Sequence, residues 1–314
     1  MGRKGYRTWR VVVLSGPVSA LNRCRADRIK TPLIQNTIKK GFMGHMQLGS
    51  ATTEYTNLYD KGLLYPIARQ PQRAEHGIEP NNAPFAGRDL WNAYEFTYLT
   101  PQGKPTADVL QIEVPFNSSA IIESKSMKLY LGSFAGTRFE GLEAVIECLE
   151  RDLTAACQGL VQVRSVDPEP VSVLSARLEA AHCLDDEAVG VPEGGYSTDT
   201  LSLASSEVAE VTYYSDLFRS LCPMTGQPDF ARIILRMTGP QLARPGLLQY
   251  LFSYREHGEF AEQVAERLFM DLYQAAKPSK LGVRAEFTRR GGIDINAERV
   301  LGYRDWDYVR HYRQ

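Results

Sequence analysis

Hydrophobic and polar residues alternate with a period of two in two neighbouring runs of the chain. The runs cover residues 90–99 and 107–114, and a Pro-Gln-Gly-Lys turn separates them. This pattern predicts a β-hairpin. After a mixed segment at 121–130, apolar residues recur at helical spacing and predict a helix over about 140–157, and residues 160–166 predict a closing strand.

A second stretch of the chain repeats the same order of elements. Residues 230–237 predict a strand, residues 247–254 lead into a helix over about 259–276, and residues 281–287 predict another strand. The apolar positions of this helix recur every four residues and should face a sheet. They are Phe260, Val264, Leu268 and Leu272.

The two stretches are also similar in amino-acid sequence. Residues 128–134 align with 248–254, and residues 149–153 align with 268–272, at an offset of about 120 positions. Internal duplication explains both the shared letters and the shared order. The sequence therefore predicts an α+β fold of two tandem modules, each with helices packed on one face of an antiparallel sheet.

Composition divides the remainder of the chain. The 314 residues, 43% of them hydrophobic and 23% charged, are enough for two domains of ordinary size. The region between the modules is rich in Asp, Glu, Ser, Gly and Pro, and it is predicted to be a linker with one short strand at 172–178. The expected domains are a basic extension at 1–45, a first module at 46–166, a linker at 167–205 and a second module at 206–314.

Charge sets the first 45 residues apart. They contain ten Lys or Arg and one acidic residue, whereas the whole chain has 36 basic and 37 acidic residues and a net charge of −1. An apolar run at 11–14 is broken at once by Ser-Gly-Pro, so it is too short for a secretory core or a membrane span. We interpret this extension as a disordered or non-native leader.

The cysteines favour a reducing compartment. There are five of them, at widely spaced positions and without a CxxC pair or a Cys/His cluster. This spacing suggests neither a disulfide framework nor a zinc site. We therefore expect a cytoplasmic protein that needs no metal.

One stretch combines a thiol with a carboxylate. Residues 220–230 place Cys222 and Asp229 seven positions apart, across a turn that contains two prolines and a glycine. A nucleophilic thiol needs a neighbouring group that accepts or donates a proton. Such a turn can hold the thiol and the carboxylate at a fixed distance and orientation. The alternative is a partly buried cysteine that acts as a small hydrophobic residue.

Two further clusters could bind polar ligands. Residues 123–128 offer a carboxylate, two hydroxyls and two ammonium groups, and the alternative is the charged edge of a strand. Residues 289–292 join two arginines, which can bind phosphate bidentately, to two glycines that let a ligand approach the backbone. Their alternative is a surface hairpin.

The remaining polar residues favour structural readings. Glu259, Glu262 and Glu266 share a helix face away from the apolar positions, which by default is a solvated face. His257, just before that helix, fits a capping or surface role. The other positions are predicted to lie in a solvated loop (His182 and Cys183) or in helix packing (Cys148 and Cys157).

Together and in this order, the clusters resemble one family, the NADPH-dependent 7-cyano-7-deazaguanine reductases (QueF) of queuosine biosynthesis. The resemblance runs from about residue 48 to the end of the chain, and its order of motifs is that of the bimodular form, built from two tunnelling-fold (T-fold) units. The residues that carry it are 122–131, 220–230, 262–267 and 289–296.

The resemblance implies a reaction and a site. A nitrile is reduced by two hydrides from NADPH to 7-aminomethyl-7-deazaguanine, with Cys222 forming a covalent thioimide and Asp229 donating the proton. It also implies a homodimer, with no direct nucleic-acid or membrane partner. By position, the substrate-binding residues are Ile122, Glu123, Ser124, Ala261 and Glu262. The residues that contact NADPH are Ser124, Lys125, Arg290 and Gly291.

One position departs from the family pattern. Where the family commonly has Phe-His-Glu-Gln, this chain has Phe-Ala-Glu-Gln at 260–263, so the imidazole expected beside the substrate is replaced by Ala261. His257 or a water could substitute for it, or the enzyme could be slow. The alternative function is a deazapurine-binding protein of the same fold that forms the adduct without completing the reduction. A zinc-dependent T-fold enzyme lacks its paired His and Cys ligands here.

Overall fold

The computed structural model describes residues 56–80, 82–166, 178, 181–303 and 314. The predicted leader at 1–45 lies outside the described residues, as does the predicted strand at 172–178 except for its last residue.

The first module contains the predicted hairpin. Strands β2 (Ala86–Leu99) and β3 (Pro105–Pro115) pair antiparallel, and β5 (Gln162–Ser165) adds to the outer side of β3. The predicted helix is confirmed as α3 (Leu142–Cys157). Its cysteines, Cys148 and Cys157, are buried and help to pack it. Ahead of the hairpin, the chain forms a short helix (η1, Lys61–Leu63), a strand (β1, Pro66–Ala68) and a second helix (α1, Gln70–Glu75).

The charged strand edge that the sequence offered as one interpretation of residues 123–128 does not form. The chain forms β4 (Ala120–Ile122), which pairs with β1, and then turns into helix α2 (Ser124–Gly132). The reason is local, because the Glu123 carboxylate accepts hydrogen bonds from the backbone N–H groups of Lys125 (2.9 Å) and Ser126 (2.8 Å). This N-terminal cap satisfies donors that a new helix leaves open.

The second module contains more strands than the sequence predicted. The strands predicted at 230–237 and 281–287 are confirmed as parts of β8 (Pro228–Leu242) and β9 (Lys280–Phe287). Three strands were not predicted: β6 (His182–Cys183), β7 (Leu203–Leu221) and β10 (Ile293–Leu301). Helix α5 (Arg244–Ser253) ends at a 3₁₀ turn (Tyr254–Glu256), and helix α6 (Ala261–Ala276) follows it. No helix in the described residues is long and apolar enough to cross a bilayer.

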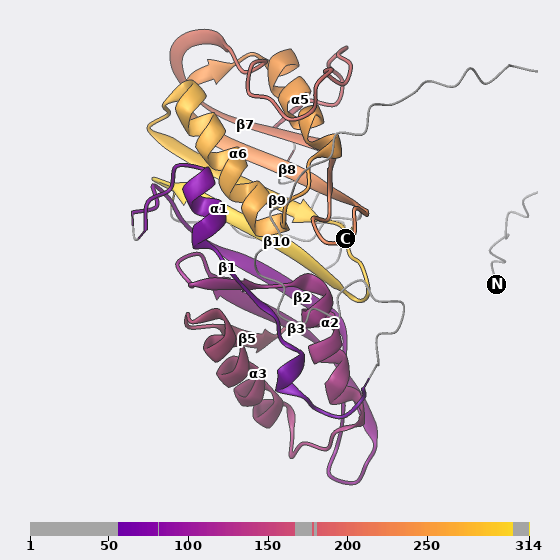
Figure 1. The fold of residues 1–314 in the computed structure, drawn as a ribbon. Coiled ribbons are helices and arrows are strands. Elements are labelled where there is room, and N and C mark those ends of the chain that lie inside the picture. The colour runs from indigo at the N-terminus through magenta and orange to yellow at the C-terminus, as the bar shows by residue number, and fades with distance from the viewer. Residues whose placement is uncertain (1–55, 81, 167–177, 179–180, 304–313) are drawn as a thin grey trace, which may run out of the picture. The chain divides into compact units, whose positions relative to one another are not determined.

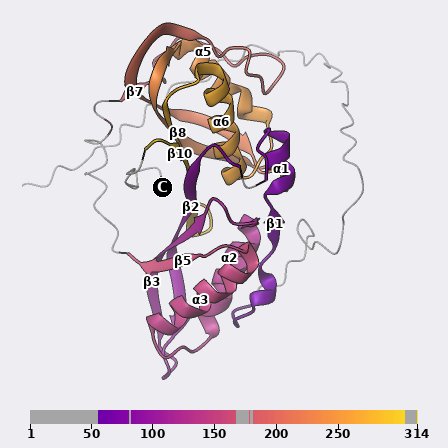
Figure 2. The same cartoon turned by 90° about the vertical axis from the view of Figure 1, so that its left-hand side faces the viewer.

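One eight-stranded sheet runs through both modules, in the order β5-β3-β2-β10-β9-β8-β7-β6. All neighbours are antiparallel except β6 and β7. The modules are joined by eight residue pairs between β2 and β10, from Ala93 opposite Ile293 to Ala86 opposite Val300. The helices α2, α3, α5 and α6 lie on one side of this sheet (Figures 1 and 2). The predicted α+β fold, with helices packed on one face of an antiparallel sheet, is therefore confirmed, and the two predicted sheets are fused into one.

Internal duplication is visible in single hydrogen bonds. In the first module, the hydroxyl of Tyr130 on α2 donates to Asp152 on α3. In the second, the hydroxyl of Tyr250 on α5 donates to Asp271 on α6. Each of these hydrogen bonds joins the two helices that cover the apolar core of one module. The two modules therefore pack their helices in the same way.

A buried ion network lies where the modules meet. Arg299 on β10 is fully buried and donates to Asp89 on β2 (2.8 Å) and to Glu266 on α6 (2.9 Å). Arg73 on α1 donates to Glu266 (2.7 Å), and Arg69 pairs with Asp89. Buried charges are costly unless they are paired, and here three guanidinium groups share two carboxylates.

The prediction that Glu259, Glu262 and Glu266 form a solvated helix face is wrong. All three are buried, with 4%, 3% and 2% of their surface exposed. The reason is tertiary, because α1 and the arginines of the ion network cover this face of α6. Helix α6 is thus enclosed on its polar side as well as on its apolar side.

We predict that Glu266→Gln lowers the free energy of unfolding by about 3 kcal/mol or more, because it leaves buried guanidinium groups short of a charge. Urea unfolding measures the change. Glu113→Gln, in the partly exposed pair of Arg88 and Glu113, is the matched control and should cost about 1 kcal/mol or less. Equal losses in the two variants would contradict a structural role for the network.

Candidate active site

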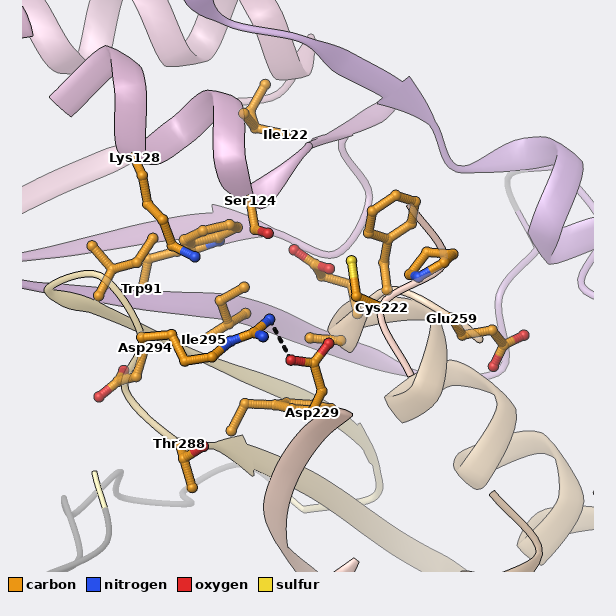
Figure 3. A pocket seen from close by; sticks show the side chains of 17 residues that line it. Trp91, Ile122, Ser124, Lys128, Cys222, Asp229, Glu259, Thr288, Asp294 and Ile295 are labelled. Atoms are coloured by element: carbon orange, nitrogen blue, oxygen red, sulfur yellow. Dashed lines mark ion pairs between the residues drawn. The ribbon is translucent and has the colours of Figure 1, made fainter. Parts of the chain in front are cut away.

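A cleft opens where the two modules face each other, with about 540 Å³ of empty space (Figure 3). Its walls come from β2, from the start of α2, from the turn between β7 and β8, from the start of α6 and from the β9–β10 connection. Segments that are far apart in sequence therefore meet at one place. Among the residues predicted to act, those that line this cleft are Ile122, Ser124, Cys222, Asp229, Ala261, Glu262 and Arg290.

Cys222 is held by a tight turn at the end of β7. Its backbone N–H donates to the carbonyl of Gln227 (2.8 Å), and its carbonyl accepts from Gly226 (2.9 Å). Gly226 has a φ of 68°, a conformation that favours glycine. The preceding Leu221 donates to the carbonyl of His257 and accepts from Glu259, which fastens the turn to the approach of α6. The thiol is buried at the cleft wall.

Asp229 stands at the start of β8 and points into the same cleft (Figure 3). Burial raises the pKa of its carboxyl, although the positive charges of Arg290 and Lys128 oppose the shift. Arg290 also forms an ion pair with it. A carboxyl whose pKa is raised keeps its proton to a higher pH, which suits a donor.

Ala261 and Glu262 form the first turn of α6 at the back of the cleft. Burial, together with the negative charge of Asp89, raises the pKa of Glu262 to about 8. Most Glu262 side chains therefore carry a proton at neutral pH. A neutral carboxyl can both donate and accept a hydrogen bond, so it can bind a polar ring edge.

Glu123 and Ile122 lie at the junction of β4 and α2. The side chain of Ile122 is buried and lines the cleft, whereas the Glu123 carboxylate borders the neighbouring cleft and caps α2. Each of its oxygens already accepts one backbone N–H, from Lys125 or Ser126. A carboxylate offers about four lone-pair sites, so further donors can still be accepted.

A second cleft, with about 640 Å³ of empty space, adjoins the first. The two share Ser124, Lys128, Cys222 and Arg290, and Lys125 lines the second cleft only. Three cationic side chains thus border it, which fits a ligand that carries phosphates.

Gly291 lines neither cleft, but it follows Arg290, which lines both, and has a φ of 60°. A Cβ there would come within 3.2 Å of the Lys128 side chain. Glycine is therefore required where the backbone passes the lysine. In the part of the chain that the structure describes, no three His, Cys, Asp or Glu side chains gather as metal ligands.

Several residues that line the cleft were not predicted as site residues, among them Trp91, Lys128, Thr288 and Asp294. Lys128 and Asp294 belong to the motifs that carry the family resemblance, so position in a motif was the available signal. Asp294 accepts hydrogen bonds from Asn92 and Asn296, both at 2.7 Å. Trp91 belongs to the predicted hairpin, where the alternation of apolar and polar residues indicated only that its side chain is buried in the core.

His257 does not line the cleft. Its Nε2 is 3.3 Å from Oε2 of Glu259, and its ring is tilted by 31° against that of Tyr196, with 5.0 Å between the ring centroids. Burial works against ionisation of Glu259, but contacts with His257, His76 and Arg267 hold its pKa well below the usual range. The imidazole nearest in sequence to Ala261 therefore faces a buried carboxylate whose pKa is lowered.

Comparison with known proteins gives two family matches. Residues 55–165 match the family model "Nitrile reductase, 7-cyano-7-deazaguanine-reductase N-term", and residues 228–304 match "QueF-like protein".

Two relatives carry the name NADPH-dependent 7-cyano-7-deazaguanine reductase. The protein of Burkholderia vietnamiensis strain G4 is 45% identical over 259 residues, which cover 82% of this chain and 93% of that protein. The protein of Chromobacterium violaceum is 41% identical over 252 residues, which cover 80% and 90%. Among solved structures, the apo archaeosine synthase QueF-Like aligns with 31% of this chain and 96% of its own, at 18% identity and a TM-score of 0.27.

We predict that Glu262 makes stability depend on pH. The folded-state pKa of Glu262, about 8, exceeds its ordinary value of 4.5. The protonated carboxyl therefore stabilises the folded state fully below pH 4.5, and this stabilisation is lost as the pH rises through 8. Glu262→Gln keeps a neutral group at every pH. Its stability relative to wild type should therefore rise by about 1 to 3 kcal/mol between pH 5.5 and pH 8.5, measured by urea unfolding.

The control for this prediction is Glu143→Gln, which changes the exposed carboxylate in the first turn of α3, the corresponding helix of the first module. Its stability difference from wild type should be the same at both pH values. A Glu262→Gln difference that does not change with pH would mean that the buried carboxyl is already ionised at pH 5.5.

Proposed function

This chain belongs to the NADPH-dependent 7-cyano-7-deazaguanine reductase family, and we propose that it reduces the nitrile of 7-cyano-7-deazaguanine to an aminomethyl group. The product would enter the synthesis of queuosine in tRNA. The observation that carries the proposal is the meeting of Cys222, Asp229 and Glu262 in one cleft, beside a second cleft bordered by cations.

The first step is covalent. The thiol of Cys222 adds across the carbon–nitrogen triple bond, forming a sulfur–carbon bond and a thioimide, while Asp229 delivers a proton to the nitrogen on which negative charge develops. The thiol proton restores the neutral carboxyl, so no net charge is created in the cleft. Its raised pKa supports Asp229 as the donor.

Reduction follows at an sp² carbon. NADPH, when bound, supplies the hydride for each of two reductions. We assign its binding to Ser124, Lys125, Arg290 and Gly291, because the cationic groups match phosphates and Gly291 lets the backbone pass closely. Between the two reductions the carbon–sulfur bond breaks, which returns the Cys222 thiol and leaves an imine.

The substrate ring would be recognised by the residues at the start of α6 and α2 that line the first cleft or border it. Glu262 would hydrogen-bond the polar edge of the deazaguanine, and Glu123 would use its remaining lone pairs for the exocyclic amino group. Ile122, Ser124 and Ala261 complete the walls around it. The burial of both carboxyl groups supports this assignment, because buried hydrogen bonds discriminate strongly between ring edges.

Ala261 supports a second candidate, a deazapurine-binding protein that forms the adduct but does not complete reduction. The turnover measurement below separates the two, because only the reductase oxidises NADPH. We also propose a cytoplasmic homodimer, since T-fold sheets commonly close by association, and modules at 46–166 and 206–314.

We predict that wild-type protein, mixed with 7-cyano-7-deazaguanine, gains the mass of one substrate and then oxidises two NADPH per nitrile. Cys222→Ala should abolish both signals, because no other thiol lines the cleft within the described residues. Intact-mass spectrometry and NADPH absorbance report them. Cys183→Ala, on β6, is the control and should keep both. An adduct that survives in Cys222→Ala would show that the nucleophile is misassigned.

We predict that Asp229→Asn slows adduct formation by about 100-fold or more, because the amide cannot donate a proton to the developing nitrogen anion. Substrate binding without covalent reaction, measured by calorimetry on the Cys222→Ala background, should change much less. An adduct that forms at the wild-type rate in Asp229→Asn would assign proton delivery to another group.

A further inference from the structure

Lys128 stands where the two clefts join. Its side chain reaches from α2 into the first cleft on the side of Ser124 (Figure 3), and it also lines the second cleft. It is half-buried, and it makes no ion pair or hydrogen bond among the described residues. Arg290 differs, because its guanidinium is held by Asp229.

Charged and titratable groups face Lys128 from several elements. Glu123 belongs to the start of its own helix, Cys222 to the β7–β8 turn, Asp229 to β8 and Arg290 to the β9–β10 connection. Asp294 on β10 lines the same cleft. Burial, followed by the charge of Arg290, lowers the pKa of the Lys128 ammonium, while Glu123, Asp229 and Cys222 oppose the shift.

With the ring in the first cleft and NADPH in the second, as proposed above, hydride would reach the substrate carbon where the clefts join. A proton for the substrate nitrogen should then come from the residues that both clefts share. These are Ser124, Lys128, Cys222 and Arg290. Cys222 holds the carbon, Arg290 cannot be deprotonated in a protein, and a serine hydroxyl is a far weaker acid than an ammonium. Lys128 is therefore the shared residue that can release a proton.

We propose that Lys128 is a catalytic residue that protonates the substrate nitrogen during reduction, in the place of the imidazole replaced at Ala261. This inference rests on the proposed function. In each reduction the hydride forms the new carbon–hydrogen bond, the carbon–nitrogen π pair moves to nitrogen, and the ammonium gives nitrogen its proton. Lys128 becomes neutral and is reprotonated from water.

The assignment separates Lys128 from the other acids of the site. Asp229 serves the addition of the thiol, which precedes any hydride transfer, and Glu262 binds the ring. His257 does not line either cleft, and its imidazole faces Glu259. Only Lys128 is thus placed for the later protons among these residues.

The test is Lys128→Arg, which keeps the positive charge but cannot release a proton. The variant should still form the covalent adduct, and its KM for NADPH should stay within about threefold of wild type. Its kcat should fall by about 100-fold or more, the usual contribution of a general acid, and the alkaline fall of kcat with pH should disappear. Lys104→Arg, in the exposed β2–β3 turn, is the matched control and should behave as wild type.

A second variant supplies the rescue. Adding Ala261→His to Lys128→Arg restores an imidazole beside the substrate and should recover at least tenfold in kcat. Normal adduct formation in both variants shows that the site is folded.

Three outcomes would overturn the proposal. In the first, Lys128→Arg keeps the kcat of wild type. In the second, Lys128→Ala raises KM for NADPH at unchanged kcat, which makes Lys128 a phosphate ligand only. In the third, Ala261→His fails to rescue. A wild-type protein that forms the adduct and never oxidises NADPH refutes the proposed function itself, and this inference falls with it.

Discussion

Arg299 is fully buried between Asp89 and Glu266, and this arrangement ties the two modules into one site. The strand pairing of β2 with β10 fixes register, but backbone bonds alone do not set how α6 meets the sheet. The guanidinium does so, because an uncompensated charge at that depth would cost several kcal/mol. The start of α6, and with it Glu262, is held at a defined place in the cleft.

Electrostatics within the cleft follow from this burial. Asp89 belongs to the ion network, yet its negative charge also reaches Glu262 and favours the protonated form there. At the opposite wall, Arg290 neutralises Asp229 without cancelling the effect of its burial. The site therefore combines two carboxyl groups whose pKa values are raised by burial with cations at its mouth.

Ala261 on α6 stands where the family resemblance led us to expect an imidazole, so another acid, on α2, was considered. An imidazole is not required if another acid reaches the junction of the two clefts, because general acid catalysis depends on position and pKa more than on residue type. Lys128 satisfies the positional condition through the helix that the Glu123 cap begins. A single capping carboxylate thus links the fold of the first module to the chemistry of the second.

The sequence by itself determined the duplicated α+β pattern, the helices α3 and α6, and the clusters around Cys222 and residues 123–128, because periodicity, turn residues and motifs are local signals. It did not determine that α2 is a helix, since its charged residues fit a strand edge equally well until the cap is seen. It also placed Glu259, Glu262 and Glu266 in solvent. Only the tertiary structure decided that they are buried, because the groups that cover them, Arg73 and Arg299, come from distant parts of the chain, and charge burial depends on such long-range contacts.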